Sequence, residues 1–161
     1  MDFINFLTGI KNREICAITY SFSLEKEKDK IISSIGEYRE ILNIDEKFSP
    51  IVFNRDDIIN SILYDEKKCN LLVLDLNKIE GVSSQKIKNF IYSFRDSNFY
   101  YKLIIFTATN RRDANTMVLD NSIKNNSLIY GCDYMFYIQM DNTVKTLKNR
   151  RGETDKLYSI N

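Results

Sequence analysis

The sequence contains no histidine among its 161 residues. This absence excludes histidine-based catalytic triads, imidazole general bases and most zinc sites at once. No Gly-x-x-x-x-Gly-Lys-Ser/Thr segment occurs either, so the chain lacks the loop that commonly holds a nucleotide phosphate. A self-sufficient nucleotide hydrolase is therefore not expected.

An excess of charge of one sign and long apolar runs are also missing. The 23 lysines and arginines nearly cancel the 22 aspartates and glutamates, so any contact with a polyanion must come from a local patch. No stretch approaches the roughly 18 apolar residues of a membrane span. The start Met1-Asp2-Phe3 lacks the basic segment of a signal peptide. We therefore predict a cytoplasmic protein without a membrane partner.

Cysteine is scarce, with three residues that are widely spaced: Cys16, Cys69 and Cys132. Each lies in or next to an apolar, strand-like run. This placement predicts buried, reduced thiols and argues against a metal or redox role.

Hydrophobic periodicity predicts alternating helices and strands along one undivided domain, residues 1–161. Helices are predicted over 2–11, from Ser23 to about Leu42, after Asn54, and after a cap at Ser83 or Ser84. Strands are predicted over 14–22, 51–53, 70–75, 103–107, 134–138, 143–149 and 156–160. The last two should form a hairpin with Arg151-Gly152 at its turn.

This alternation, with continuous apolar strands, predicts an α/β fold. We expect three layers, with a mostly parallel sheet flanked by helices and a C-terminal antiparallel hairpin. In such sheets, polar groups at the carboxyl ends of the strands converge on the ligand crevice. The rule selects four residues as candidates: Glu25, Asp75, Thr107 and Asn110.

Two of these candidates are carboxylates that follow predicted strands. Asp75 ends the apolar run 71–74, where it could bind Mg²⁺ directly or through water. A strand-end aspartate that caps a turn is the alternative. Glu25 could orient a water for in-line attack on a γ-phosphate, or it could be a first-turn glutamate favoured by the helix dipole.

The densest basic patch lies near the end of the chain. Lys148 and Arg150 are two residues apart on a predicted strand, so they should point to one face and suit a phosphate or carboxylate supplied from outside. A solvated hairpin that pairs with Glu153 or Asp155 is the alternative. A second, thinner basic segment contains Arg111, Arg112 and Lys124, which offers only a weak footprint for DNA.

The order of these segments resembles the RecA-like motor domain of DnaB-type replicative hexameric helicases, entered just after the phosphate loop. Three segments at strand ends are similar to the family's Phe-Ser-Leu-Glu segment, its Walker B strand and its γ-phosphate-sensing segment, in that order: 21–25, 71–75 and 106–111. The segment Lys148-Asn149-Arg150-Arg151-Gly152 looks like the family's Lys-Gln-Arg-Asn-Gly turn. Ala108 or Asn110 stands where the family has its sensor glutamine.

The resemblance assigns roles to the candidates. It implies that Glu25 is a vestigial catalytic base, that Asp75, Thr107 and Asn110 face the nucleotide, and that Asp75 holds any Mg²⁺. It implies that Lys148 and Arg150 reach a neighbouring subunit's ATP, with Arg150 as an arginine finger in trans.

The family's first core strand and phosphate loop have no counterpart in the sequence. The leading hypothesis is therefore a degenerate domain without independent ATPase activity. It would associate with a helicase, another RecA-like ATPase or its own copies in DNA replication or recombination. No cofactor is expected to bind tightly, and ATP with Mg²⁺ is expected at most at a site between subunits.

Two other classes stay open. The segments around Asp75 and Thr107, followed by Gly131-Cys132-Asp133-Tyr134, also resemble a CheY-like response-regulator receiver. That resemblance makes Asp75 the phospho-acceptor and Thr107 the switch residue, but the expected Lys-Pro after the fifth strand is absent. A plain interaction module with no phosphate chemistry is the remaining class.

Overall fold

The computed structural model describes residues 2–44, 70–79, 83–96, 101–109, 131–152, 154 and 156–160. The helices in this part of the chain are α1 (Phe3–Thr8), α2 (Glu25–Ser34) and α4 (Ser84–Asp96), with short 3₁₀ turns at Phe22–Leu24 and Leu76–Lys78. The strands are β1 (Ile15–Ser21), β2 (Arg39–Ile41), β3 (Leu71–Asp75), β4 (Lys102–Thr109), β5 (Tyr134–Ile138), β6 (Thr143–Asn149) and β7 (Leu157–Ser159).

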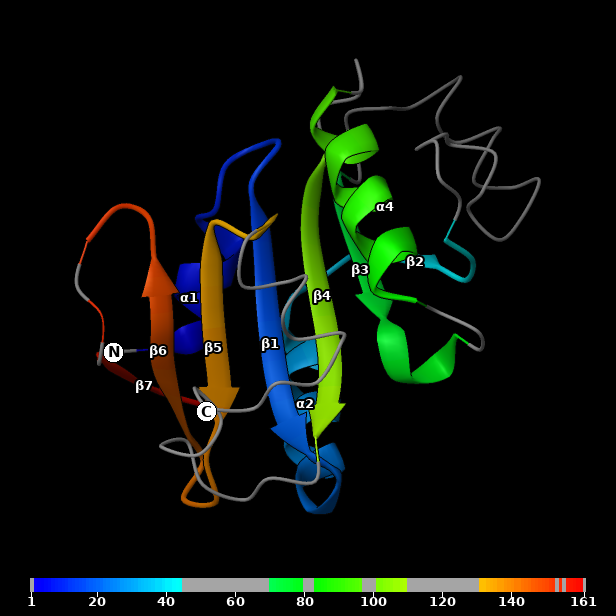
Figure 1. Ribbon diagram of the computed structural model, residues 1–161. Helices are drawn as coiled ribbons and strands as arrows, with labels where there is room; N and C mark the ends of the chain where they lie inside the picture. The colour runs from blue at the N-terminus through cyan, green and yellow to red at the C-terminus, as the bar shows by residue number, and fades with distance from the viewer. Residues whose placement is uncertain are drawn as a thin grey trace.

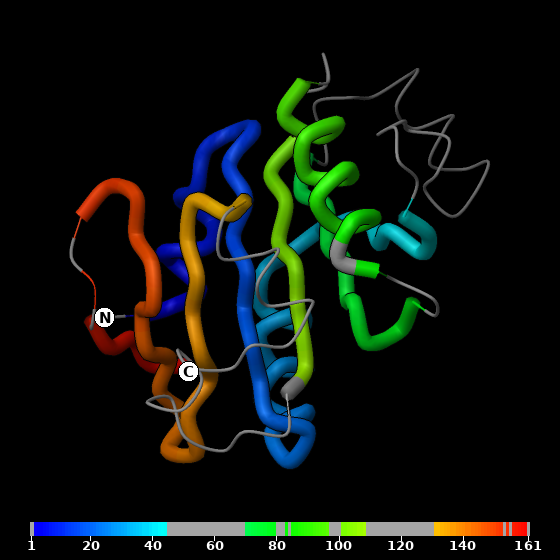
Figure 2. The backbone as a smooth tube through the Cα atoms, viewed as in Figure 1, coloured from blue at the N-terminus to red at the C-terminus, as the bar shows by residue number. Residues whose placement is uncertain are grey.

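These strands form one sheet in the order β2-β3-β4-β1-β5-β6-β7 (Figure 1). The first five strands in this order are parallel, whereas β6 and β7 add antiparallel strands at one edge. Asp2 forms an isolated bridge with Ser159, so the start of α1 lies beside the last strand (Figure 2). The mostly parallel sheet and the C-terminal hairpin were both predicted from the sequence.

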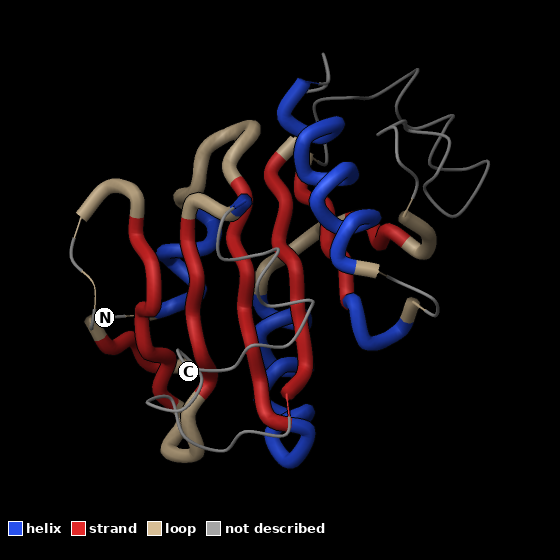
Figure 3. The backbone as a smooth tube through the Cα atoms, in the orientation of Figure 1, coloured by secondary structure: helices blue, strands red, loops and turns tan. Residues whose placement is uncertain are grey.

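Helices cover both faces of the sheet, as Figure 3 shows. The helix α4 packs on one face, while α1 and α2 lie on the other. Along β1, Ile15 and Ala17 contribute to the core beneath α4, whereas Cys16 and Ile18 contribute to the core beneath α1 and α2. Side chains of a strand alternate between faces, so an unbroken apolar run fills two cores at once.

The helix α4 follows its predicted pattern closely. Its apolar stripe, Ile87, Phe90, Ile91 and Phe94, is buried against the sheet. The Ser83 hydroxyl accepts a hydrogen bond from the Lys86 amide at 3.2 Å, which is the predicted cap. No helix within the described residues is long and apolar enough to cross a membrane.

The predicted helix from Ser23 to Leu42 is wrong at both ends. Leu24 precedes α2 without a side-chain cap, and the Ser21 hydroxyl instead accepts a hydrogen bond from the Ser23 amide before the 3₁₀ turn. The helix ends at Ser34 because Gly36 adopts a φ of 86°, the left-handed conformation that commonly terminates helices. Residues Arg39–Ile41 then form the edge strand β2.

The structure confirms some of the predicted strands and the buried cysteines and changes the position of Arg150. The strands β3 and β5 and the C-terminal hairpin are confirmed, and Cys16 and Cys132 are buried free thiols. Arg150 lies in the turn after β6 and not on the strand, because β6 ends at Asn149. The predicted strand 51–53, the helix after Asn54 and Cys69 lie outside the described residues.

The receiver hypothesis is contradicted by the strand order. A receiver has the order 2-1-3-4-5, in which the strand bearing the phospho-acceptor lies next to the first strand. Here β1 lies between β4 and β5, and β3, which ends at Asp75, lies between β2 and β4. The two antiparallel strands beyond β5 depart from that topology as well.

Candidate functional site at the carboxyl edge of the sheet

The carboxyl ends of β1, β3 and β4 form the place where a ligand crevice is expected. After β1 the chain passes to α2 behind the sheet, and after β3 it reaches α4 in front (Figure 1). In open α/β sheets, ligands bind outside the carboxyl ends of the strands. The turn between β1 and α2, together with Asp75 and Thr107, lies at this edge.

A buried ion pair occupies this edge on the α2 side. The Lys28 ammonium lies 3.2 Å from Asp75 Oδ2, and the two side chains are only 2% and 4% exposed. The other carboxylate oxygen of Asp75 accepts a hydrogen bond from the Asn77 amide at 3.0 Å. Both oxygens of the predicted metal ligand are therefore engaged within the chain.

Two further acids surround the Lys28 ammonium. Asp29 Oδ1 lies 3.3 Å away and Glu25 Oε1 lies 3.8 Å away, and both of these side chains are more than half exposed. Burial alone lowers the pKa of Lys28, but the Asp75 carboxylate outweighs it and holds that pKa above its ordinary value. The ammonium therefore stays charged. It lies between Glu25 and Asp75, two residues that the sequence predicted for this site.

The phenol of Tyr20 completes the buried side of this cluster. Its ring centroid is 5.4 Å from the Lys28 ammonium, and its hydroxyl is buried without a hydrogen-bond partner among the described residues. Burial, with the Asp75 carboxylate as a second cause, raises the pKa of Tyr20 to about 12. The phenol is therefore neutral at physiological pH and offers no anion to this edge.

Lys28 was not among the predicted site residues, although the sequence contains a signal for it. Ile31 of α2 and the residues that cap the helix, Leu24 and Ile35, are buried on one side. Lys28 falls on the same stripe at helical spacing. A lysine at a core position needs a buried partner, because an unpaired charge in the interior is costly. The isolated carboxylate at the end of β3 is the partner that this rule predicts.

Thr107 does not share a face with Asp75. In β4, Ile105 belongs to the core beneath α4 and Phe106 to the opposite core, so the alternation directs Thr107 to the α4 face. Its neighbour in register is Thr19 of β1, which is also buried. Asn110, Arg111, Arg112 and Lys124 lie outside the described residues.

The segment from the end of β1 to Lys28 can be aligned with a phosphate loop by length, but it lacks the glycines and the Ser/Thr of that loop. If Lys28 is placed at the lysine of Gly-x-x-x-x-Gly-Lys-Ser/Thr, the two glycine positions are Phe22 and Glu27, and Asp29 replaces the Ser/Thr. Glycines in that motif let the backbone approach the phosphates. Here Glu25 and Glu27 occupy the first turn of α2, where their charge repels a phosphate.

The position of β1 bears on the sequence alignment. The resemblance placed residues 21–25 at the family's Phe-Ser-Leu-Glu segment and left the first core strand and the phosphate loop without a counterpart. In the sheet, β1 is an interior strand, flanked by parallel β4 and β5, and it leads through a 3₁₀ turn into α2. A strand, a turn and a helix are therefore present in the arrangement that carries a phosphate loop in nucleotide hydrolases.

Lys148 and Arg150 lie at the opposite edge of the sheet. Lys148 pairs with Met135 and Asn149 with Tyr134, at the start of β5 and hence at the amino ends of the parallel strands (Figure 1). A single chain thus does not bring Lys148 and Arg150 together with Asp75. Any shared site would require a second protomer.

Asp133 is the partner of Arg150 at this amino edge. The Arg150 guanidinium lies 2.5 Å from Asp133 Oδ1, and Arg95 lies 3.1 Å from Oδ2. The Ile15 amide also donates to Oδ2 at 2.8 Å. Asp133 is buried, whereas the Arg150 side chain is 57% exposed, so this arginine both secures the hairpin and faces solvent.

Glu14 forms a second acidic centre beside the hairpin. It pairs with the Arg151 guanidinium and accepts hydrogen bonds from the Tyr134 hydroxyl at 2.8 Å and from the Lys11 amide at 2.6 Å. Burial raises its pKa, but these donors outweigh burial and lower the pKa below its ordinary value. The predicted partners Glu153 and Asp155 lie outside the described residues.

No protein-family model matches the chain, and no curated protein matches its sequence. Solved structures do match the fold. A RadB recombinase superposes with a TM-score of 0.55 at 10% identity, covering 92% of this chain and 87% of that one. A protein of Pyrococcus horikoshii OT3 superposes with a TM-score of 0.55 at 12% identity, covering 99% and 98% of the two chains.

The fold is therefore RecA-like α/β, as predicted. At these identities the likeness concerns the fold alone. The narrower resemblance to DnaB-type helicases, the single domain over residues 1–161 and the cytoplasmic location stay predictions.

Proposed function

We propose that this chain is a degenerate RecA-like module that does not hydrolyse ATP by itself. It works by association with a RecA-like ATPase, such as a helicase or recombinase, or with a second copy of itself, in DNA replication or recombination. The observation that carries the first part is the buried pair of Lys28 and Asp75 below a turn without glycine.

Nucleotide binding at this turn would require the pair to separate. Asp75 would have to leave Lys28 to coordinate Mg²⁺, and the buried ammonium would then lose the buried carboxylate that pairs with it. Removing one partner from a buried ion pair costs about 3–5 kcal/mol. The negative charges of Glu25, Glu27 and Asp29 around the turn oppose a triphosphate as well.

Association is supported by exposed apolar side chains at the same edge. Phe22, in the turn after β1, is 50% exposed, and Met140, in the turn between β5 and β6, is 71% exposed. Both turns lie at the carboxyl end of the sheet (Figure 1). Apolar side chains at this end suit a protein surface better than a charged nucleotide.

A role in trans for Lys148 and Arg150 is a separate part of the proposal. Half of the Arg150 side chain remains accessible although it pairs with Asp133. A neighbouring subunit's phosphate could therefore be reached from the amino edge. This role needs a partner with a competent nucleotide site, which the proposed ATPase would supply.

The first experiment titrates the isolated chain with a fluorescent ATP analogue and Mg²⁺. We expect no saturable binding to the wild type or to Asp75→Asn. Tight binding by the wild type that Asp75→Asn abolishes would contradict the proposal, because it would show an open site at this edge.

The second experiment measures association directly. The tagged chain is used to capture RecA-like ATPases from the native host, with identification by mass spectrometry, and light scattering reports self-association. We expect the double variant Phe22→Ser/Met140→Ser to lose the partner and Tyr92→Ser, an exposed residue on α4, to retain it. Failure to recover any ATPase or replication protein, with a monomeric chain, would count against the proposal.

The role of Arg150 is tested in the same assay. If it acts on a partner's ATP, Arg150→Ala should leave capture intact while lowering the partner's stimulated ATPase rate. An unchanged rate would remove the role in trans and leave only the pairing with Asp133.

A further inference from the structure

The carboxyl edge of the sheet carries an excess of negative charge. Three carboxylates, those of Glu25, Asp29 and Asp75, lie between 3.2 and 3.8 Å from the single ammonium of Lys28. Because the buried Asp75 already pairs with this ammonium, two negative charges are left over on Glu25 and Asp29. Their side chains are 63% and 65% exposed, so both carboxylates are accessible to another molecule.

The helix α2 directs these two acids to one side. With 3.6 residues per turn, each residue is rotated by about 100° from the one before it. Glu25 and Asp29 therefore fall on the same flank of Lys28. The exposed Lys26 and Lys30 fall on the opposite side of the helix. These two lysines thus point away from the acids.

A hydroxyl without a partner lies beside the same acids. Tyr20 is 1% exposed, and its hydroxyl makes no hydrogen bond within the described part of the chain. Burial is the first cause of its raised pKa, followed by the carboxylate of Asp75, and Glu25 and Asp29 contribute in the same direction. The hydroxyl therefore lies among these acids, and its oxygen can accept a hydrogen bond from a ligand.

An exposed aromatic ring is close to the acids in the chain. Phe22 lies three residues before Glu25, in the 3₁₀ turn that leads into α2, and is 50% exposed. A guanidinium stacks on aromatic rings, and its five N–H donors can serve several oxygen acceptors at once. An ammonium has three donors and is more strongly hydrated. The groups gathered at this edge are therefore those that recognise an arginine side chain.

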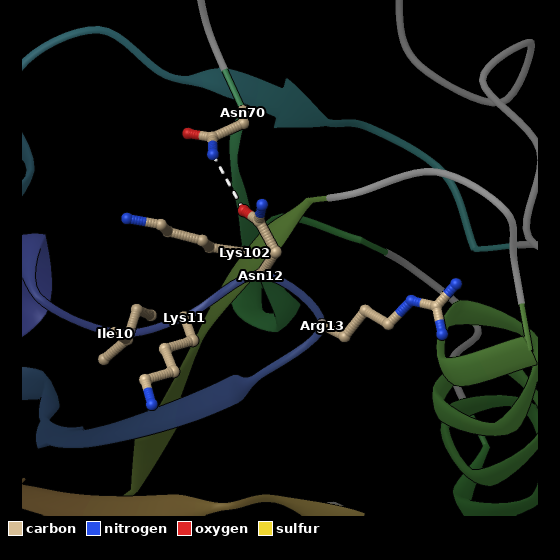
Figure 4. A pocket seen from close by; sticks show the side chains of 6 residues that line it. All are labelled: Ile10, Lys11, Asn12, Arg13, Asn70 and Lys102. Atoms are coloured by element: carbon tan, nitrogen blue, oxygen red, sulfur yellow. Dashed lines mark hydrogen bonds between the residues drawn. The ribbon is translucent and has the colours of Figure 1, made fainter. Parts of the chain in front are cut away.

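The amino edge of the sheet offers the opposite surroundings. A surface hollow there is lined by Ile10, Lys11, Asn12, Arg13, Asn70 and Lys102, as Figure 4 shows. Three of these residues are cations and none is an acid. A cationic segment of another protein is therefore repelled from the hollow and attracted to the carboxyl edge.

We propose that Glu25 and Asp29 form a binding site for an arginine side chain of a separate partner protein, with Phe22 as the stacking surface. The inference rests on the proposed association and names the chemistry of the partner's surface, which is a basic segment bearing arginine. The contact needs no nucleotide, because carboxylates of this chain supply the negative charge. It therefore suits a turn that lacks the glycines of a phosphate loop.

A second copy of the chain is a poorer source of this arginine. The exposed hairpin arginines, Arg150 and Arg151, already pair with Asp133 and Glu14. Moving either one to Glu25 of another copy would exchange one carboxylate for another without a gain in charge pairing. An arginine of a different protein brings no such loss.

The test uses a fluorescently labelled glycine peptide that contains two arginines, and anisotropy reports its binding to the isolated chain at low salt. In a matched peptide, citrulline replaces both arginines, which keeps the shape and removes the charge. We expect the wild type to bind the arginine peptide about tenfold more tightly than the citrulline peptide. Glu25→Gln/Asp29→Asn should abolish this preference.

The matched control is Glu37→Gln/Asp96→Asn, which removes two exposed acids elsewhere and changes the net charge equally. It should keep the tenfold preference, and circular dichroism should show that both double variants are folded. Phe22→Ser should weaken binding of the arginine peptide by a factor of about three, because the stacking surface is lost.

Four outcomes would overturn the proposal. The wild type could bind both peptides equally, or the control variant could lose the preference as completely as Glu25→Gln/Asp29→Asn does. Spermidine could bind as tightly as the arginine peptide, which would show a site for any polycation. Light scattering could show self-association that is lost in both Glu25→Gln/Asp29→Asn and Arg151→Ala, which would make a second copy the occupant.

Peptide binding is measured without any protein from the host, so its failure is distinguishable from failure of the proposed function. Capture of an ATPase that persists in Glu25→Gln/Asp29→Asn, together with equal binding of the two peptides, would count against this inference alone. A clear preference for arginine without any captured ATPase would count against the proposed function alone.

Discussion

The two edges of the parallel sheet carry opposite electrostatic arrangements. At the carboxyl edge a buried cation, Lys28, is surrounded by acids. At the amino edge a buried acid, Asp133, is surrounded by Arg95, Arg150 and a backbone amide. Each edge thus neutralises one interior charge with partners from other elements.

The edges differ in how far the partners are buried. Lys28 and Asp75 are both excluded from solvent, so neither can regain hydration if the other is removed. The arginines around Asp133 are 28% and 57% exposed and can return to water. Lys28 and Asp75 thus form a dry pair that closes the carboxyl edge, whereas the paired arginines at the amino edge are partly exposed to solvent.

The largest expected effect breaks the dry pair. Within the described part of the chain, Lys28→Met leaves the buried Asp75 carboxylate with the Asn77 amide alone, and we expect a loss of about 3–5 kcal/mol in the free energy of unfolding. Urea denaturation measures this loss. The double variant Lys28→Met/Asp75→Leu should recover most of it, because a well-packed apolar pair replaces an ion pair at little cost.

This recovery is the decisive part of that prediction. A double variant as unstable as Lys28→Met would mean that packing around Lys28, and not the charge of Asp75, sets the cost. Lys26→Met removes an exposed lysine from the same helix and should stay near wild-type stability.

A smaller effect is expected at the amino edge. Asp133→Ala leaves the buried Ile15 amide without its side-chain acceptor, while both arginines can rehydrate. We expect a loss of about 2–3 kcal/mol, below that of the dry pair.

Arg150→Ala should cost about 1 kcal/mol or less, because its side chain is largely exposed. Thermal denaturation of the two variants in parallel would show whether the edges differ as described.

The smallest expected effect concerns the pH dependence of stability at the two edges. The pKa of Glu14 is lowered from about 4.5, so its ionisation stabilises the fold above that value and the contribution is lost as pH falls through the folded pKa. The raised pKa of Lys28 has the opposite consequence, with stability present below about pH 10.4 and lost as pH rises further. Glu14→Gln should therefore flatten the acid limb of the stability–pH curve and leave the alkaline limb unchanged. A variant that flattens neither limb would show that the Glu14 contacts do not persist in solution.

Much of the sheet could be read from local pattern. The runs 71–74 and 134–138 are apolar throughout, which is typical of strands covered on both faces, and the structure places β3 and β5 there. The stripe of α4 followed from 3.6-residue spacing in the same way. The edge strand β2 was missed, because its three residues follow a helix and gain strand structure only by pairing with β3.

The candidate site was predictable in part. Asp75 was found by its place after an apolar run, but its partner Lys28 was not, since the two are separated by 47 residues. Lys148 and Arg150 were predicted as a pair because basic residues are dense in this segment. Their position at the opposite edge depends on the direction of β6. Pairing with β5 decided that direction.

The class of fold follows from the amino-acid sequence, because alternating apolar periods dictate which segments become strands and which become helices. It also determined that no glycine-rich phosphate loop is present. Three features arise only when the chain folds: β1 lies inside the sheet, Lys28 pairs with Asp75 at the end of β3, and a surface hollow gathers residues 10–13, Asn70 and Lys102. Each of these features joins groups far apart in the chain, and such contacts depend on strand order, which local pattern does not encode.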